Sequence, residues 1–257
     1  MIPLRDENPT SRRAVVTILL ILVNLAVYFG IQYPKGSDAA ALFEYRWAGV
    51  PCEVHTGKPI ELVPFGAPVP AAVAQCAVTA TGIAAPRPAF PHKNVWLAVF
   101  FSMFLHGSVL HVLGNMLFLW IFGNNVEDQL GRFGFLALYL VGGMVASIVH
   151  IAGNLDSTSP FLGASGAIAV VMGAYIVWFP RARILTLVPI AVIFLPVRLP
   201  AIVVLGLWFV LQVLTQSSSG IATLAHIGGF VFGMLVAFVL TRAAGFPRRV
   251  PPPAPGY

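Results

Sequence analysis

Charged residues are scarce in this 257-residue chain: Asp, Glu, Lys and Arg make up 9% of it, against roughly a quarter in a typical soluble domain. Hydrophobic residues make up 58%, and the mean hydropathy is +0.87. This composition excludes an ordinary soluble globule and predicts several membrane-spanning helices of roughly 20 residues each. The net charge of +6 does not indicate nucleic-acid binding, because the basic residues are scattered singles and pairs, as expected of residues that flank membrane spans.

Long apolar runs with no Asp or Glu predict an all-α, polytopic membrane protein with six spans. We expect these spans at 14–33, within 95–123, and at 134–152, 164–179, 199–214 and 224–241. The first run is longer than the apolar region of a signal peptide, so we expect it to be kept as a span. The stretch 184–197 is too short to span and contains two prolines, so we expect a re-entrant or interfacial segment on the cytoplasmic side.

The distribution of Lys and Arg predicts the orientation of this bundle. With six spans, ten of the fifteen basic residues lie on the cytoplasmic side, which is the positive-inside pattern. We therefore expect a cytoplasmic N-terminus at 1–13, a membrane domain at 14–241 with a long extracytoplasmic loop at 34–93, and a disordered cytoplasmic tail at 242–257. Only two cysteines occur, Cys52 and Cys76, both in the long loop, and their spacing is compatible with a disulfide or with two thiols.

Four polar side chains are predicted to lie at one depth near the outer surface, because spans 2, 4 and 6 run in the same direction. They are His111 and Asn115 in span 2, Ser165 at the start of span 4 and His226 at the start of span 6. Polar side chains inside a membrane are costly and usually mark function. Ser165 alone could be a helix N-cap, but a nearby imidazole could accept its proton and make it a nucleophile.

The same layer offers donors for an oxyanion. Asn115 has a side-chain amide, His111 an imidazole N–H, and Ser165 its own backbone N–H at a helix start. Gly163 lets the backbone turn tightly and approach a substrate closely. No carboxylate lies within a span, so a Ser–His dyad is favoured over a triad, and no spacing indicates a metal site.

Small residues predict close packing of the two helices that carry the dyad. Ala169 and Gly173 continue the face below Ser165, and Gly229 and Gly233 continue the face below His226. Small side chains let helix backbones approach in a membrane.

At these residues the chain resembles the rhomboid family of intramembrane serine proteases. The matching motifs, in order, are His106-x4-His111-x3-Asn115, Gly123-x3-Glu127-x3-Gly131, Gly163-Ala-Ser165-Gly166 and Ala225-His226-x2-Gly229-x3-Gly233. The resemblance implies that Ser165 is the nucleophile, His226 the base, and His111 and Asn115 oxyanion ligands, with Glu127 and His106 structural. It also implies cleavage of transmembrane protein substrates in the lipid bilayer, without a cofactor; we expect a bacterial plasma membrane.

Two positions depart from the family pattern. Leu97 follows Trp96 where the family has a Trp-Arg pair, and Ala169 stands where some members have a tyrosine that stacks on the catalytic histidine. Trp208 or Phe230 could support His226 instead.

Two other function classes are considered: a rhomboid-like chaperone or scaffold without catalysis, and a transporter or channel. The first usually lacks the nucleophile or the base, and the second is disfavoured by the lack of carboxylates in the spans.

Overall fold

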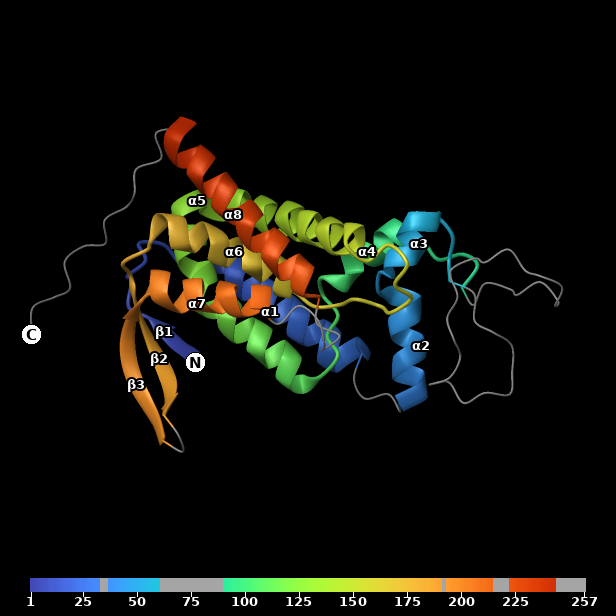
Figure 1. Ribbon diagram of the computed structural model, residues 1–257, viewed down its shortest axis with the longest axis horizontal. Helices are drawn as coiled ribbons and strands as arrows, with labels where there is room; N and C mark the ends of the chain where they lie inside the picture. Colours follow the sequence, from blue (N-terminus) through green and yellow to red (C-terminus); the bar gives the residue numbers. More distant parts are fainter. Residues whose placement is uncertain (33–36, 61–89, 191–192, 215–221, 244–257) are drawn as a thin grey trace, which may run out of the picture.

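The computed structural model describes residues 1–32, 37–60, 90–190, 193–214 and 222–243, and it is mostly helical (Figure 1). The helices are α1 (Val15–Ala26), continued by the π-helical turn η1 (Val27–Gln32), then α2 (Ser37–Trp47), α3 (Pro51–Thr56), α4 (Val95–Ser102), α5 (Val109–Ala152), α6 (Ser165–Trp178), α7 (Ala201–Leu214) and α8 (Thr223–Ala243). The strands are β1 (Ile2–Asp6), β2 (Arg183–Ile190) and β3 (Ile193–Pro200).

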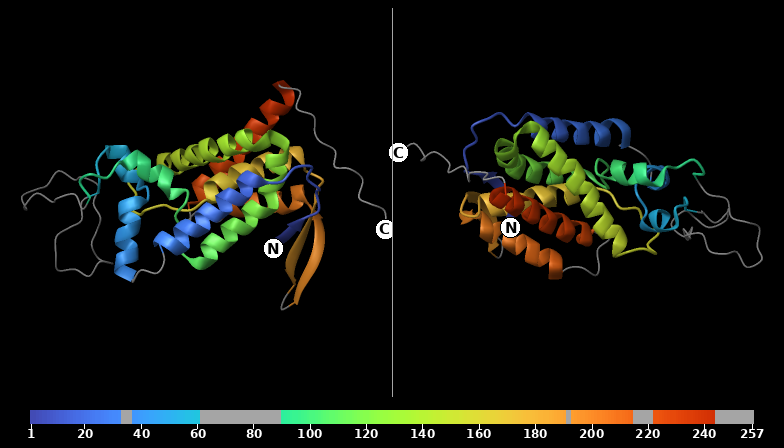
Figure 2. Two further views of the ribbon diagram at one scale, coloured as in Figure 1. Left: turned by 180° about the vertical axis from the view of Figure 1, so that it is seen from behind. Right: turned by 90° about the horizontal axis from the view of Figure 1, so that it is seen from above.

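Helix α5 is two antiparallel segments joined at Gly131. The backbone there has φ 75° and ψ 169°, a conformation that glycine adopts without the strain a Cβ would bring. The ribbon of α5 reverses its direction part-way along the helix (Figures 1 and 2). Helix therefore continues on both sides of a turn at one glycine, through the residues 123–134 that separate the second and third predicted spans.

The predicted second span is interrupted near its start. Helix α4 ends at Ser102, and α5 begins only after Ser108, whose hydroxyl accepts a hydrogen bond from the N–H of His111 (3.1 Å). His106 lies in the connection between the two helices rather than in a span. Its backbone exchanges two hydrogen bonds with the side chain of Gln32, which ties this connection to the end of η1.

Helix α6 forms the centre of the bundle and packs against α5 and α8. Ten of its fourteen residues are buried. A Cβ at Gly233 would overlap the carbonyl oxygen of Val170, and a Cβ at Gly173 would overlap that of Phe230. The backbones of α6 and α8 are thus in direct contact, as the small residues on the two helices predicted.

A three-stranded antiparallel sheet of order β1-β2-β3 corrects the all-α prediction, and its strands β2 and β3 occupy the stretch 184–197 that was expected to be re-entrant or interfacial. The two prolines oppose a helix but not these strands. Pro189 lies on β2 beyond the residues that pair with β1, and Pro196 lies on the edge strand β3, where a missing N–H is tolerated.

The end of the bundle next to the sheet holds the start of α1. The carboxylate of Glu127 accepts hydrogen bonds from the N–H of Val16 (2.9 Å) and from the N–H and hydroxyl of Thr17 (both 2.8 Å). Asp128 accepts from the N–H and hydroxyl of Ser11. Glu127 therefore has a structural role: its carboxylate binds the first N–H groups of α1, which have no partner within the helix itself.

Three helices in the described part of the chain are long and apolar enough to cross a membrane: α1 with η1, α5 and α8. Helices α6 and α7 are apolar but shorter. Helices α6, α7 and α8 follow the predicted spans closely, as does α1 with η1. In the long first loop, Cys52 is disulfide-bonded, while Cys76 and the predicted tail from residue 244 lie outside the described residues.

Candidate active site

The structure brings Ser165 and His226 into hydrogen-bond contact. Ser165 is the first residue of α6 and His226 lies in the first turn of α8. The distance from the Oγ of Ser165 to the Nε2 of His226 is 2.7 Å. The contact depends on the close packing of α6 and α8, since a Cβ at Gly229, one turn below His226, would meet the carbonyl oxygen of Gly166.

A third side chain, Gln212 of α7, fixes the proton of His226. The Oε1 of Gln212 lies 2.8 Å from the Nδ1 of His226. An amide oxygen can only accept, so Nδ1 carries the proton and Nε2 has the lone pair that faces the hydroxyl of Ser165. Sequence reasoning missed Gln212. The signal was available, because Gln212 is the one amide or charged side chain in the sequence of α7.

Trp208, one turn before Gln212 on α7, packs against the imidazole of His226. Its ring centroid lies 5.9 Å from that of His226 at an interplanar angle of 40°, and it also contacts Phe230. Of the two rings considered from the sequence, Trp208 is the one that contacts His226. Ala169, where some rhomboids have a tyrosine, is fully buried in the core.

Gly163 lies between His111 and Ser165. Its φ is 129°, and a Cβ there would lie 2.9 Å from the Nε2 of His111. The N–H of Gly107 donates to the Nδ1 of His111 (3.4 Å), so the proton of the ring is on Nε2, the atom next to Gly163. His106 packs edge-on against the ring of His111, with centroids 5.1 Å apart.

A cavity of about 500 Å³ opens above the Ser–His pair. Its lining includes four of the five predicted site residues and one acidic residue from the first loop: Glu44, Gly107, His111, Asn115, Pro160, Phe161, Leu162, Ser165, Ala222 and His226. The amide nitrogen of Asn115 is buried and has no hydrogen-bond partner in the described structure, which leaves a free donor beside the cavity. No group of three His, Cys, Asp or Glu side chains within the described ranges could hold a metal ion.

Residues 93–243, more than half of the chain, match the family model of the Rhomboid domain. This chain belongs to the rhomboid family. It is 34% identical over 145 residues to Presenilin-associated rhomboid-like protein A, mitochondrial, of Danio rerio, covering 55% of this rhomboid and 37% of the relative. It is 30% identical over 159 residues to Rhomboid protein 1, mitochondrial, of Saccharomyces cerevisiae (57% and 42% covered). It is 34% identical over 139 residues to Rhomboid protease GlpG of Yersinia pestis (54% and 46% covered).

This rhomboid therefore spans less than half of the length of each of these relatives, and the matches support the rhomboid domain rather than any whole relative. The family and the apolar helices together identify an integral membrane protein.

Proposed function

We propose that this chain is an intramembrane serine protease that hydrolyses peptide bonds in or next to transmembrane segments of membrane proteins. The single observation that carries the proposal is the 2.7 Å contact between Ser165 and His226, on an imidazole whose other nitrogen is bound by Gln212. A serine hydroxyl becomes a nucleophile when a positioned base accepts its proton. The relative named as a rhomboid protease supports the same activity.

In the proposed reaction, the Oγ of Ser165 attacks the carbonyl carbon of the scissile bond while its proton passes to the Nε2 of His226. His226 then returns this proton to the leaving amine, and an acyl group stays on Ser165 until a water molecule, deprotonated in the same way, releases it. No metal or cofactor is used.

Three donors are proposed to stabilise the negative charge on the carbonyl oxygen. They are the Nε2–H of His111, the free amide N–H of Asn115 and the backbone N–H of Ser165 at the start of α6. Donors placed in advance of the reaction are most effective in a cavity with little water. Gly163 is proposed to leave room for the substrate backbone between His111 and Ser165, a gap that a side chain would fill.

We infer six spans from the helices around this site. Four are α1 with η1, α6, α7 and α8, and the other two are the two segments of α5. The reversal at Gly131 and the position of β1 beside β2 support this count, because the chain starts at the end of the bundle opposite to the Ser–His pair (Figure 1). The membrane domain is accordingly proposed at 14–241, with the first loop and the active site facing the same side.

The compartment is assigned only as a membrane. Two of the three relatives are named mitochondrial, which conflicts with the predicted bacterial plasma membrane, and the third is from a bacterium. The proposed partners are transmembrane protein substrates and the surrounding lipids.

The deciding experiment is cleavage of a model transmembrane substrate by the purified protein in detergent, combined with labelling by a fluorophosphonate probe. Wild type is expected to cleave and to be labelled. Ser165→Ala should lose labelling and more than about 10³-fold in kcat, and His226→Ala should lose a similar factor, because the two residues act as a unit. Undiminished labelling or cleavage by Ser165→Ala would exclude this assignment. Stable client binding without any cleavage would favour the scaffold function instead.

A further inference from the structure

Glu44 is the one carboxylate among the side chains that line the cavity above Ser165 and His226. It belongs to α2, in the long first loop for which sequence reasoning found no role. Helix α2 lies at the end of the bundle at which α6 and α8 begin (Figures 1 and 2). The first loop therefore contributes one acidic side chain to the cavity. The other polar side chains that line it are Ser165, Asn115 and two histidines.

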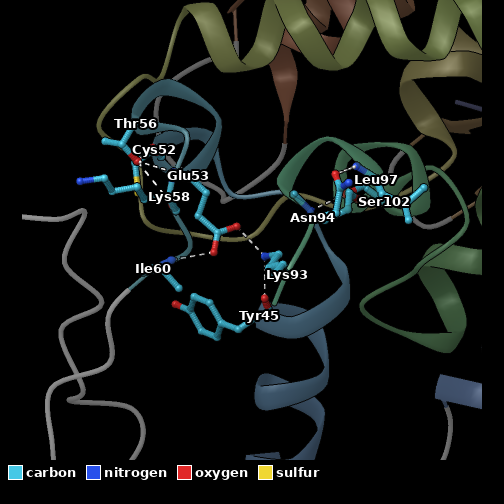
Figure 3. A network of polar contacts seen from close by, with 12 residues as sticks. Tyr45, Cys52, Glu53, Thr56, Lys58, Ile60, Lys93, Asn94, Leu97 and Ser102 are labelled. Atoms are coloured by element: carbon cyan, nitrogen blue, oxygen red, sulfur yellow. Dashed lines mark hydrogen bonds and ion pairs between the residues drawn. The ribbon is translucent and has the colours of Figure 1, made fainter. Parts of the chain in front are cut away.

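A buried ion pair holds this part of α2 in place (Figure 3). The Nζ of Lys93 donates to the backbone oxygen of Tyr45, the residue next to Glu44 (2.7 Å), and pairs with the carboxylate of Glu53 (2.5 Å). Glu53 also accepts from the N–H of Ile60 (2.9 Å). Burial lowers the pKa of Lys93, and the contact with Glu53 opposes that effect. These contacts anchor the first loop, although Leu97 replaces the arginine of the family's Trp-Arg pair.

A second set of contacts relates the end of α2 to the residues beside the nucleophile. The N–H of Gly49 donates to the hydroxyl of Ser102 (2.6 Å), and the backbone oxygen of Ser102 accepts from the N–H of Gly163 (2.8 Å). The backbone oxygen of Gly49 accepts from the N–H of Phe161 (2.9 Å). These contacts fix α2, and with it Glu44, relative to the segment that leads into Ser165.

The charge of Glu44 has no partner of its own. Its side chain is half-buried, and it forms no hydrogen bond or ion pair in the described structure. Burial raises the pKa of its carboxyl group. A charge that has lost part of its hydration is stabilised when an opposite charge reaches it. Because Glu44 lines the cavity, an opposite charge on a bound substrate segment can reach its carboxylate there.

We propose that Glu44 is a specificity-determining residue that selects substrate segments with a Lys or Arg side chain close to the scissile bond. The inference rests on the proposed protease function. The ligand class is a transmembrane segment with a basic juxtamembrane residue, whose ammonium or guanidinium group pairs with Glu44 while its backbone lies at Ser165.

The test uses the full-length protein in detergent and a model transmembrane substrate that carries Lys, Gln or Glu at each position within three residues of the cut. Wild type is expected to cleave the best-placed Lys substrate with a kcat/KM about five- to tenfold above the matching Gln substrate, and the Glu substrate still more slowly. Glu44→Gln should remove this preference, so that the Lys and Gln substrates are cleaved with equal kcat/KM. Glu44→Lys should reverse it. Asp156→Asn, which removes an exposed carboxylate from the loop after α5, is the matched control and should keep the wild-type preference.

The two proposals fail in different ways. If wild type is labelled by the fluorophosphonate at Ser165 and cleaves the Lys, Gln and Glu substrates at equal rates, the role of Glu44 is wrong and the protease function stands. The same conclusion follows if Glu44→Gln keeps the wild-type preference. If wild type is neither labelled nor able to cleave any of the substrates, the protease function is wrong and the inference fails with it.

Discussion

At the scale of single residues, the contact between Gln212 and His226 predicts that Gln212 positions the imidazole, a role that no acidic residue fills among the described residues. Gln212→Met keeps the length of the side chain but removes the acceptor for Nδ1–H. Because one neutral hydrogen bond contributes about 1 kcal/mol, we expect kcat to fall roughly five- to tenfold, with little change in KM. Cleavage of a model substrate by the purified variant measures both values.

Gln212→Glu distinguishes positioning from mere packing. A carboxylate accepts the same proton and increases the basicity of the imidazole, so this variant should keep or exceed the wild-type kcat and shift its pH dependence. Val213→Ala, at an exposed neighbouring position, should leave kcat unchanged. A Gln212→Met enzyme as fast as wild type would show that His226 needs no partner at Nδ1.

The residues of the Ser–His pair could be predicted from the sequence, whereas Gln212 was missed for a topological reason. Ser165 and His226 both start helices that run in one direction, so their shared depth follows from counting spans. Helix α7 runs the opposite way, and a residue at the same depth lies near its end rather than its start. The rule that intramembrane polar residues mark function applies to Gln212 equally well.

At the scale of elements, the direct backbone contact of α6 and α8 predicts that Gly233 tolerates no side chain. Gly233→Ala places a methyl group on the carbonyl oxygen of Val170, so the helices must separate. We expect a loss of about 1–3 kcal/mol in unfolding free energy and a fall in activity as Ser165 and His226 move apart. Thermal unfolding in detergent and substrate cleavage measure the two effects.

Gly206→Ala on α7 is the matched control, because nothing lies within 4 Å of the added Cβ. The same substitution there should be neutral or stabilise the helix by up to about 1 kcal/mol. Equal effects at positions 206 and 233 would contradict the close packing of α6 and α8.

Strand β1 is held to the bundle by Asp6, and this contact predicts a pH dependence. The Oδ2 of Asp6 accepts from the hydroxyl of Tyr175 and the amide of Asn125 (both 2.6 Å). Burial raises the pKa of Asp6 from 3.8 to about 6, with the hydrogen bonds opposing the shift. The folded state therefore binds the proton more tightly than the unfolded state. Stability contributed by Asp6 is full below about pH 4 and falls, by up to about 3 kcal/mol, as the pH rises through 6.

Asp6→Asn isolates this effect from the other titrating groups. The asparagine keeps an oxygen for Tyr175 but does not titrate, so the difference in unfolding temperature between wild type and variant should change between pH 4 and pH 7. Parallel profiles over that range would show that Asp6 is ionised equally in both states.

The sheet that contains β1 could not be predicted from the sequence. The apolar residues of 184–197 match a membrane-associated segment as well as a strand, and the prolines were read only as opposing a helix. Pairing with a strand about 180 residues earlier in the chain decides the outcome, and no local pattern encodes such a contact. The helices were predictable because long apolar runs alone identify them, except where Gly131 and Ser108 set ends that composition does not reveal.

At the scale of the whole molecule, six spans require the first loop and the sheet to face opposite sides of the membrane. Single cysteines can report this: Lys58→Cys, exposed after α3, and Ile193→Cys, exposed on β3. Cys52 is disulfide-bonded and does not react with maleimides, so wild type measures the background. In sealed vesicles of one orientation, a membrane-impermeant maleimide should label one of the two variants, and only detergent should expose the other. The six-span arrangement places three crossings, an odd number, between positions 58 and 193. Labelling of both variants from the same side would require an even number and would contradict this arrangement, which brings Ser165 and His226 to the face covered by α2.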